Sequence, residues 1–339
     1  MFLQINYRQI IIFGGIQMYK INRRCFIATA MAAMISMIQP VFAQENNKPI
    51  TLVVPYSAGG TNDNFARLLA EGMSKELNRH IIVENRPGAN GIIGASHVAR
   101  TRPDGTTLLL GGTGPISLNI LLRPALTYSF DHFDSVAMLF DGPLTITVPT
   151  SLGVDSVDEL ITYAKKKNQP LLYGTMGPGS VTNLYGLLLG QTFGVPMTAV
   201  AYKNNHSALL DLMAGRGDMN YATPIPMIKD SKELKILALT TNKRDPNLPD
   251  IPSIAELGYP QLETSYWTGL LAAKGTPKKE IDEIAAAAIK TIKTEAFQRV
   301  LTENGQIEKA GGPEILDAQL QNDREHWGKI INENKIVIN

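Results

Sequence analysis

Residues Ile50–Met73, ITLVVPYSAGGTNDNFARLLAEGM, combine an apolar run, a glycine pair and a pattern of helical spacing. Ile50–Val54 is an apolar run with β-branched residues, which predicts a buried strand, and the apolar residues from Phe65 to Leu77 recur at helical spacing. A strand that feeds a glycine turn and a helix places backbone N–H groups at the carboxyl edge of a sheet, where a helix N-terminus favours an anion. Gly59 and Gly60 would let a ligand approach the main chain closely, although one such turn can also be purely structural.

Strand and helix patterns alternate along the rest of the chain. The first part continues with strands at Ile81–Glu84 and Thr106–Gly111 and a helix at Gly91–Arg100, which completes a βαβαβ half-unit of an open parallel sheet. The pattern restarts at Ser156 and Glu159, which form a predicted capping box for the helix Val157–Lys167. Two further helices are predicted at Val181–Phe193 and Ser207–Ala214. The predicted strands of this part are Leu171–Gly174, Thr198–Tyr202, Asp218–Ala222 and Leu234–Thr240. The last part is mostly helical, with predicted helices at Glu280–Thr294 and from about Pro313 to Asn334. We therefore expect two α/β units.

The first 43 residues have the pattern of a secretory signal peptide. A basic segment, MYKINRR, precedes an apolar run at Cys25–Ile38, and VFA ending at Ala43 fits a cleavage site. The apolar run is shorter than the roughly 20 residues that span a bilayer. We therefore expect residues 1–43 to be removed and the protein to be periplasmic. The sequence leaves open whether export follows the Sec or the twin-arginine route, and whether translation starts at Met1 or Met18.

Composition excludes several classes of function. The chain has 339 residues, 44% hydrophobic and 19% charged, which is enough for two domains. Without residues 1–43, 28 basic residues face 31 acidic ones, so no basic face for nucleic acid is expected. Cys25, the only cysteine, lies in the signal segment, which leaves neither a disulfide nor a thiol nucleophile in the mature protein.

Motifs for cofactors, metals and catalysis are missing from the sequence. There is no G-x-G-x-x-G, no Walker lysine and no G-x-S-x-G. The histidines have no metal-binding spacing; they are His80, His97, His132, His206 and His326. We therefore expect no cofactor, no metal and no catalytic residue.

A second glycine loop matches the first. YGTMGPGSVTNLYG at Tyr173–Gly186 is again strand, loop and helix, with hydroxyls at Thr175, Ser180 and Thr182 and an amide at Asn183. Two such ends facing each other would clamp a small anion through main-chain and hydroxyl donors.

Six segments carry a resemblance to a known family. The segments are VVPYSAGGTNDNFARLLA, VENRPGANGIIGA, PDGTTLLLGG, VAYKNNHSALLDLMAGRGDM, LALTTNKRDPNLPDIPSIAELGYP and HWGKIINE. In order and spacing they resemble the Bug (TctC) family of periplasmic solute receptors, which belong to tripartite tricarboxylate transport systems. The resemblance extends from about Pro49 onward. It implies a two-lobed type II periplasmic-binding-protein fold that closes on a small carboxylate. We expect residues 48–146 and 266–339 in one lobe and 147–265 in the other, with crossings at Leu144–Val148 and Trp267–Ala272.

The resemblance also implies roles for individual residues. Carried over by position, the first wall of the site would comprise Tyr56, Ser57, Gly59, Gly60 and Asp63, with Gly112 and Thr113 beside it. The second wall would comprise Thr175, Gly177, Ser180 and Asn183, with Tyr202 and Thr223 at the edge. The chain departs from the family pattern where Asn183 replaces a frequent histidine, AYKNNHS replaces PYKG and Ser57-Ala58 replaces prolines. These departures leave open which carboxylate is bound.

Three functions from different classes fit these patterns. The first is a monomeric receptor that delivers a carboxylate to membrane transporter subunits. The second is a receptor of the same fold that signals to a membrane sensor. The third is an exported enzyme, which would need a general base, nucleophile or metal that the sequence does not offer. Arg86 could salt-bridge a carboxylate ligand, but we expect a structural role for it.

Overall fold

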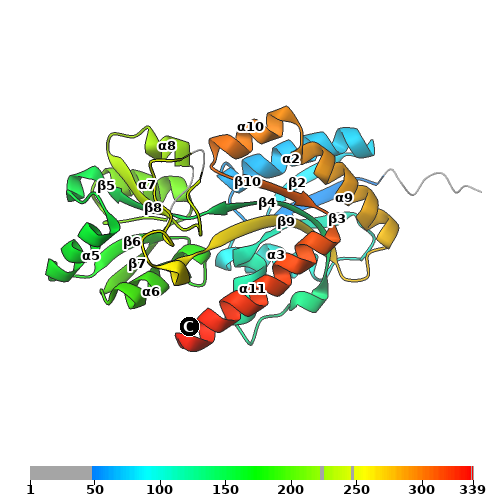
Figure 1. Ribbon diagram of the computed structural model, residues 1–339. Helices are drawn as coiled ribbons and strands as arrows, with labels where there is room; N and C mark the ends of the chain where they lie inside the picture. Colours follow the sequence, from blue (N-terminus) through cyan, green and yellow to red (C-terminus); the bar gives the residue numbers. More distant parts are fainter. Residues whose placement is uncertain (1–47, 222–224, 246–247, 337, 339) are drawn as a thin grey trace, which may run out of the picture. The chain divides into compact units, whose positions relative to one another are not determined.

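The computed structural model describes residues 48–221, 225–245, 248–336 and 338, with only the backbone at 226 and 227 (Figure 1). The described residues belong to one compact unit that spans residues 47–339. The predicted signal peptide lies outside the described residues.

A six-stranded sheet forms the first half of the fold, in the order β10-β4-β9-β3-β1-β2 (Figure 1). Its strands are β1 (Ile50–Val54), β2 (Ile81–Asn85), β3 (Thr107–Gly112), β4 (Phe133–Pro143), β9 (Ser265–Ala273) and β10 (Ile307–Gly311). The strands β1, β2 and β3 are parallel, as the βαβαβ pattern predicts, whereas β9 is antiparallel to β3 and β4. The sheet therefore joins segments from both ends of the described chain.

Helices cover both faces of this sheet because its central strands are apolar on both sides. Leu52 and Val54 point to one face, where α2 (Thr61–Leu77), α9 (Lys278–Ile292) and α10 (Glu295–Glu303) pack. Val53 points to the other face, against α3 (Ile92–Val98) and the first part of α11 (Pro313–Glu333). Shorter elements connect these layers: η2 (Ala89–Gly91), η3 (Thr113–Leu118), α4 (Asn119–Leu122) and η4 (Phe130–His132).

The second half of the fold is built from two strand pairs. β5 (Thr145–Pro149) pairs with β8 (Leu234–Leu239) in antiparallel fashion, and β6 (Leu171–Thr175) pairs with β7 (Met197–Ala201) in parallel. Bridges from Thr147 to Asn220 and from Tyr173 to Met219 place residues 219–220 between β5 and β6. The predicted strand Asp218–Ala222 is therefore reduced to two isolated bridges, with Ala222 outside the described residues.

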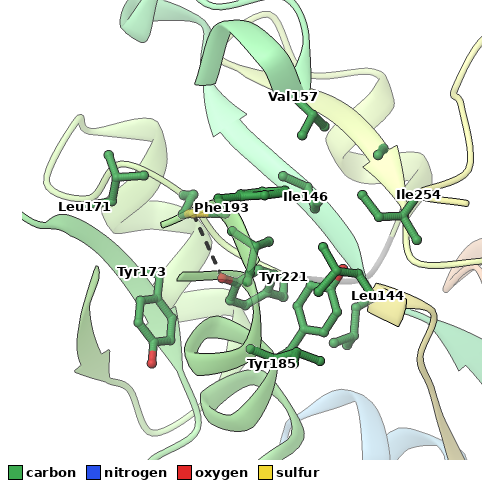
Figure 2. Close-up of a cluster of buried hydrophobic side chains, with 14 of the residues drawn as sticks. Leu144, Ile146, Val157, Leu171, Tyr173, Tyr185, Phe193, Tyr221 and Ile254 are labelled. Carbon is green, nitrogen blue, oxygen red and sulfur yellow. Dashed lines mark hydrogen bonds between the residues drawn. The ribbon is translucent and has the colours of Figure 1, made fainter. Parts of the chain in front are cut away.

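A cluster of buried side chains holds this half together, with Tyr173, Tyr185 and Tyr221 close to one another (Figure 2). Helices α5 (Val157–Lys166) and α6 (Val181–Phe193) contribute to it, while α7 (Asn205–Met213) and α8 (Ile225–Lys229) share a smaller cluster with Leu234. The short helices η5 (Thr150–Leu152) and η6 (Pro260–Leu262) complete the connections. Trp327 and Ile330 of α11 also join the larger cluster, so the last helix contributes to both halves.

Two chain crossings connect the halves, and Thr240 joins them. β4 ends at Pro143 and β5 begins at Thr145, with Leu144 between them. The buried Thr240 hydroxyl accepts a hydrogen bond from the Leu144 N–H at 2.8 Å and donates to the Thr264 carbonyl, just before β9, at 2.7 Å. One side chain therefore links both crossings.

Candidate ligand-binding site

A cavity of about 500 Å³ lies where the loops of both halves meet, within the usual size of a small-molecule site. Four loops and helix starts supply much of its lining: Tyr56, Ser57, Gly59, Gly60, Thr61 and Asn62; Thr113 and Gly114; Met176, Ser180, Val181 and Thr182; and Lys203, Asn204, Asn205 and His206. Phe65, Phe140, Leu209 and Trp267 supply apolar surface. The cavity therefore offers a small polar molecule both donors and apolar walls.

The glycine turn presents the N-terminus of α2 to the cavity. Gly60 is the N-cap residue, and the first intrahelical bond runs from the Asn64 N–H to the Gly60 carbonyl at 3.0 Å. The N–H groups of Thr61 and Asn62, which precede that bond, have no intrahelical acceptor. Neither side chain caps the helix, because α2 already begins at Thr61.

The Asp63 carboxylate fixes the conformation of this turn through hydrogen bonds. Its carboxylate accepts hydrogen bonds from the Gly59 N–H at 2.9 Å, Arg67 Nε at 3.0 Å and Asn85 Nδ2 at 2.9 Å. Burial alone would raise the pKa of Asp63, but the hydrogen bonds from Arg67, Gly59 and Asn85 outweigh it and lower that pKa below its ordinary value. The Gly59 N–H is thereby engaged within the protein, and the carboxylate does not line the cavity.

The second glycine loop presents the N-terminus of α6 in a similar way. Ser180 caps this helix, since its Oγ accepts from the Asn183 N–H at 3.2 Å and donates to the Gly177 carbonyl at 2.7 Å. The first intrahelical bond joins the Leu184 N–H to the Ser180 carbonyl, which leaves the N–H groups of Val181 and Thr182 without an intrahelical acceptor.

Contacts between the halves border the cavity. Asn90 Nδ2 donates to the Gly179 carbonyl at 2.9 Å, and an Arg123 guanidinium nitrogen donates to the Pro178 carbonyl at 3.1 Å. Both acceptors belong to the loop that precedes α6. The position of this loop therefore depends on side chains that lie between β2 and β4 in sequence.

Among the described residues, two basic side chains line the cavity. Lys203 and His206, both exposed, lie at the start of α7, whose N-cap Asn204 accepts from the Ser207 N–H at 2.8 Å. No aspartate or glutamate lines the cavity in the described part of the chain. Three helix N-termini and a lysine without acidic lining favour an anion over a cation.

A buried carboxylate, that of Asp323, fixes Trp267 in the cavity lining. Trp267 Nε1 donates to Asp323 of α11 at 2.6 Å, and the Trp267 N–H donates to Thr113 Oγ1 at 2.9 Å. Burial raises the pKa of Asp323, and the hydrogen bonds it accepts counteract this effect only in part. The indole and the Thr113 hydroxyl are thereby held in place beside the cavity.

Comparison with known proteins identifies the family. Residues 65–336 match the family described as "Tripartite tricarboxylate transporter family receptor", TctC. The chain belongs to this receptor family. A curated relative from Agrobacterium vitis, a UPF0065 protein of the TAR-I ttuE-ttuC' intergenic region, is 31% identical over 324 residues, covering 94% of this chain and 93% of the relative.

Solved receptors of similar fold confirm the architecture. Rpa4515 of R. palustris, solved with adipate, is 32% identical with a TM-score of 0.79, covering 86% of this chain and 98% of that one. MatC from Rhodopseudomonas palustris, solved with bound malate, is 29% identical with a TM-score of 0.76, covering 84% and 99%. The receptor therefore has the two-lobed periplasmic-binding-protein fold that the sequence predicts, and its relatives bind carboxylates.

The receptor's predicted site residues fall into two groups. Those that line the cavity are Tyr56, Ser57, Gly59, Gly60, Thr113 and Ser180. Those that do not line it are Asp63, Gly112, Thr175, Gly177, Asn183 and Tyr202, while Thr223 lies outside the described residues. Of the second group, Thr175 bonds the Gly177 N–H, Asn183 bonds the Gly179 N–H and Tyr202 bonds Asp211, so they shape the surrounding loops. Gly112 lies against the Trp267 carbonyl, where a Cβ would come within 2.8 Å.

Several lining residues of the receptor were not predicted from the sequence. Asn90, Tyr266 and Gln306 line the cavity from distant segments. Lys203 matches the lysine of the family pattern PYKG and was not singled out, whereas His206 lies in the part of AYKNNHS that departs from this pattern, which was the available signal. Arg86, the open alternative, pairs with Glu84 at 2.7 Å and does not line the cavity.

The described part of the receptor lacks two other kinds of feature, a metal cluster and a membrane-spanning helix. Within it, no group of histidine, cysteine, aspartate and glutamate side chains could hold a metal ion. None of the helices it contains is both long and apolar enough to cross a membrane.

Proposed function

We propose that this receptor captures a small organic acid by a carboxylate group in the cavity and delivers it to the membrane subunits of a tripartite transport system. The observation that carries the proposal is the convergence of the α2, α6 and α7 N-termini on a cavity lined by basic but no acidic side chains, within the described residues. Each helix N-terminus stabilises an anion by about 0.3–1 kcal/mol where it is exposed and more where it is enclosed.

Backbone groups are the main donors in this proposal. The N–H groups at Gly60, Thr61 and Asn62 would bind the carboxylate from one lobe, and those at Val181 and Thr182 from the other. The hydroxyls of Ser57, Thr113 and Ser180 would add side-chain contacts, and Tyr56, whose phenol has a pKa raised by burial, would stay neutral. The malate and adipate held by two relatives support a carboxylate ligand.

The remaining predicted residues would support the loops that carry these donors or border the site. We propose that Asp63, Gly112, Thr175, Gly177 and Asn183 fix the loops that carry the donors, and that Tyr202 and Thr223 border the site. Residues 48–146 and 266–339 would form one lobe and 147–265 the other. The receptor would work as a monomer in the periplasm after removal of residues 1–43, with Gln44 as its first residue.

Mass spectrometry of ligand released from natively purified protein tests the proposal, followed by thermal melting with the recovered acid. A ligand at 100 times its Kd stabilises the native state by about 2.7 kcal/mol, and each kcal/mol raises Tm by roughly 2–4 °C. The acid should be recovered chemically unchanged. Failure of every organic acid in a broad panel to raise Tm would contradict carboxylate binding, and turnover of the acid would favour an enzyme instead.

A further inference from the structure

A defined turn ends α11 and sets the direction of the chain that follows. The Ile336 N–H donates to the Ile331 carbonyl at 3.0 Å. The Lys335 N–H donates to the Asn332 carbonyl at 3.3 Å, and Lys335 has φ 49°. Two such bonds around a left-handed residue form the Schellman motif, which terminates a helix and redirects the chain.

The side chains at this turn pack against the core of the second half of the fold. Ile331, Ile336 and Ile338 are partly buried against the cluster that contains Tyr173 and Tyr185. Figure 1 shows this end of α11 beside α6. A lysine in a left-handed conformation costs free energy, and the burial of these isoleucines offsets that cost.

Ile338 also contacts the loop that precedes α6. A Cβ built on Gly179 would lie 3.3 Å from Ile338 Cδ1 and 3.2 Å from Arg123 Nη2, so both side chains lie against the Gly179 backbone. Asn90 donates to the Gly179 carbonyl at 2.9 Å. Three segments far apart in the chain, at residues 90, 123 and 338, therefore meet on one glycine.

This loop sets the position of donors in the cavity. Ser180 follows Gly179 directly, caps α6 and lines the cavity. Val181 and Thr182, whose N–H groups have no intrahelical acceptor, line it as well. Ile338 is not among the lining residues, so it can act on these donors only through the loop.

We propose that Ile338, directed by the turn at Lys335, positions the loop of residues 176–180 and thereby holds the α6 donors in the geometry that binds the carboxylate. The effect on affinity rests on the proposed function, to which the inference adds a positioning residue outside the cavity. Gly179 has no side chain of its own to pack, and Ile338 supplies the apolar contact. When the loop is competent in only a fraction of the molecules, the apparent affinity falls by that fraction.

Hydrogen exchange of the ligand-free protein tests the positioning role. Mass spectrometry of a peptide that covers residues 176–183 reports on the loop, including the Gly179 N–H, which donates to Asn183 Oδ1 at 3.1 Å. Ile338→Ala should speed exchange there about tenfold or more, which corresponds to about 1.4 kcal/mol of local opening free energy. Exchange in α2 should stay as in wild type.

Calorimetric titration measures the effect on binding. The probes are malate and adipate, which two relatives hold, and the acid recovered from the purified protein. For each acid that the wild type binds, Ile338→Ala should weaken the affinity about three- to tenfold, as expected if about a tenth to a third of the molecules keep a competent loop. The loss should appear mainly as faster dissociation.

Two control variants separate positioning from a general loss of packing. Ile338→Val keeps a β-branched contact with the loop and should resemble wild type in both measurements. Ile82→Ala makes the truncation at an isoleucine of β2 that is 55% exposed and does not line the cavity, and it should change neither measurement. Because Ile338 is only partly buried, all variants should melt cooperatively and close to wild type.

Unchanged exchange of the loop in Ile338→Ala would overturn the positioning role, as would equal acceleration in α2, which would indicate a general loss of stability. Faster exchange with full affinity for an acid that the wild type binds would overturn the link between the loop and binding. If no acid binds the wild type, the proposed function fails, while exchange of the loop still decides whether Ile338 positions it.

Discussion

At the scale of single residues, the glycine pair divides into two positions with different roles. Gly59 has φ +78°, a left-handed conformation that disfavours other residues, and its N–H bonds Asp63. Gly60 has φ −86° in extended backbone, and a Cβ built there meets only the Ser57 carbonyl at 3.5 Å. The structure therefore tolerates a side chain at Gly60, which faces the cavity, better than at Gly59.

Gly60→Val should consequently lose ligand binding before it loses stability. The branched side chain would occupy the space in front of the α2 N–H groups, while its backbone conformation suits a β-branched residue. We expect a cooperative melt within about 2 °C of wild type and no ligand-induced rise in Tm, measured by thermal melting with the cognate acid. Full affinity in this variant would mean that the turn has only a structural role.

The lowered pKa of Asp63 predicts how the stability of the protein depends on pH. Because its folded-state pKa is lowered, its contribution to stability is present above the ordinary carboxyl pKa near 4 and is lost as the pH falls through the lower folded value. Asp63→Asn should cost about 1–3 kcal/mol at pH 7, since hydrogen bonds to a charged group are lost. Urea unfolding from pH 7 down to pH 3 should show this difference between the two proteins shrinking as the solution is acidified. A constant difference over that range would refute the assigned role.

The sequence predicted part of the cavity lining because the glycine loops can be recognised locally. Gly60 and Ser180 lie directly at ends of elements that the pattern defines, and Tyr56 followed from the family resemblance. Asn90 and Gln306 could not be found in this way, because they reach the cavity only through the packing of segments far apart in the chain.

At the scale of elements, the ends of helices and strands were predictable where local signals mark them. α6 occupies Val181–Phe193 as predicted, with Ser180 as N-cap and Gly194, at φ 63°, as C-cap. β10 was not predicted because IEKAG is a largely exposed edge strand without apolar alternation. The capping box at α5 is only half formed, since Glu159 accepts from the Asp155 N–H instead of closing back onto Ser156.

We expect the Thr240 hydroxyl to stabilise the two chain crossings between the halves, because it bonds to both of them. Thr240→Val keeps the shape of the side chain but leaves the Leu144 N–H and the Thr264 carbonyl without the hydroxyl. The loss should cost about 1–3 kcal/mol, because buried groups are left without that partner. Hydrogen exchange should accelerate at Leu144 in the variant, and unchanged exchange there would argue against this link.

At the scale of the whole molecule, the proposed lobes should close around the ligand. The predicted crossings Leu144–Val148 and Trp267–Ala272 lie largely within β5 and β9, so we expect the hinge just before these strands, at Leu144 and Thr264. The bonds from Asn90 and Arg123 to the α6 loop would favour the closed state. Small-angle scattering of wild type should show compaction on addition of the cognate acid. Asn90→Ala together with Arg123→Ala should weaken that acid's affinity through a less stable closed state.

Identical scattering curves with and without saturating ligand would contradict closure by these lobes. If the curves change but the double variant binds with full affinity, closure does not depend on the two side chains. Gly328 of α11 does not line the cavity and has open space where a Cβ would lie, without a positive φ, so Gly328→Ala provides the control.

The most direct test of the account is a crystal structure of the receptor with the acid that it carries when purified. We predict that one carboxylate of the acid lies between the N-termini of α2 and α6, within hydrogen-bond distance of backbone N–H groups at residues 60–62 and 181–182. An acid bound elsewhere on the protein, or one whose carboxylate contacts neither helix N-terminus, would contradict the account.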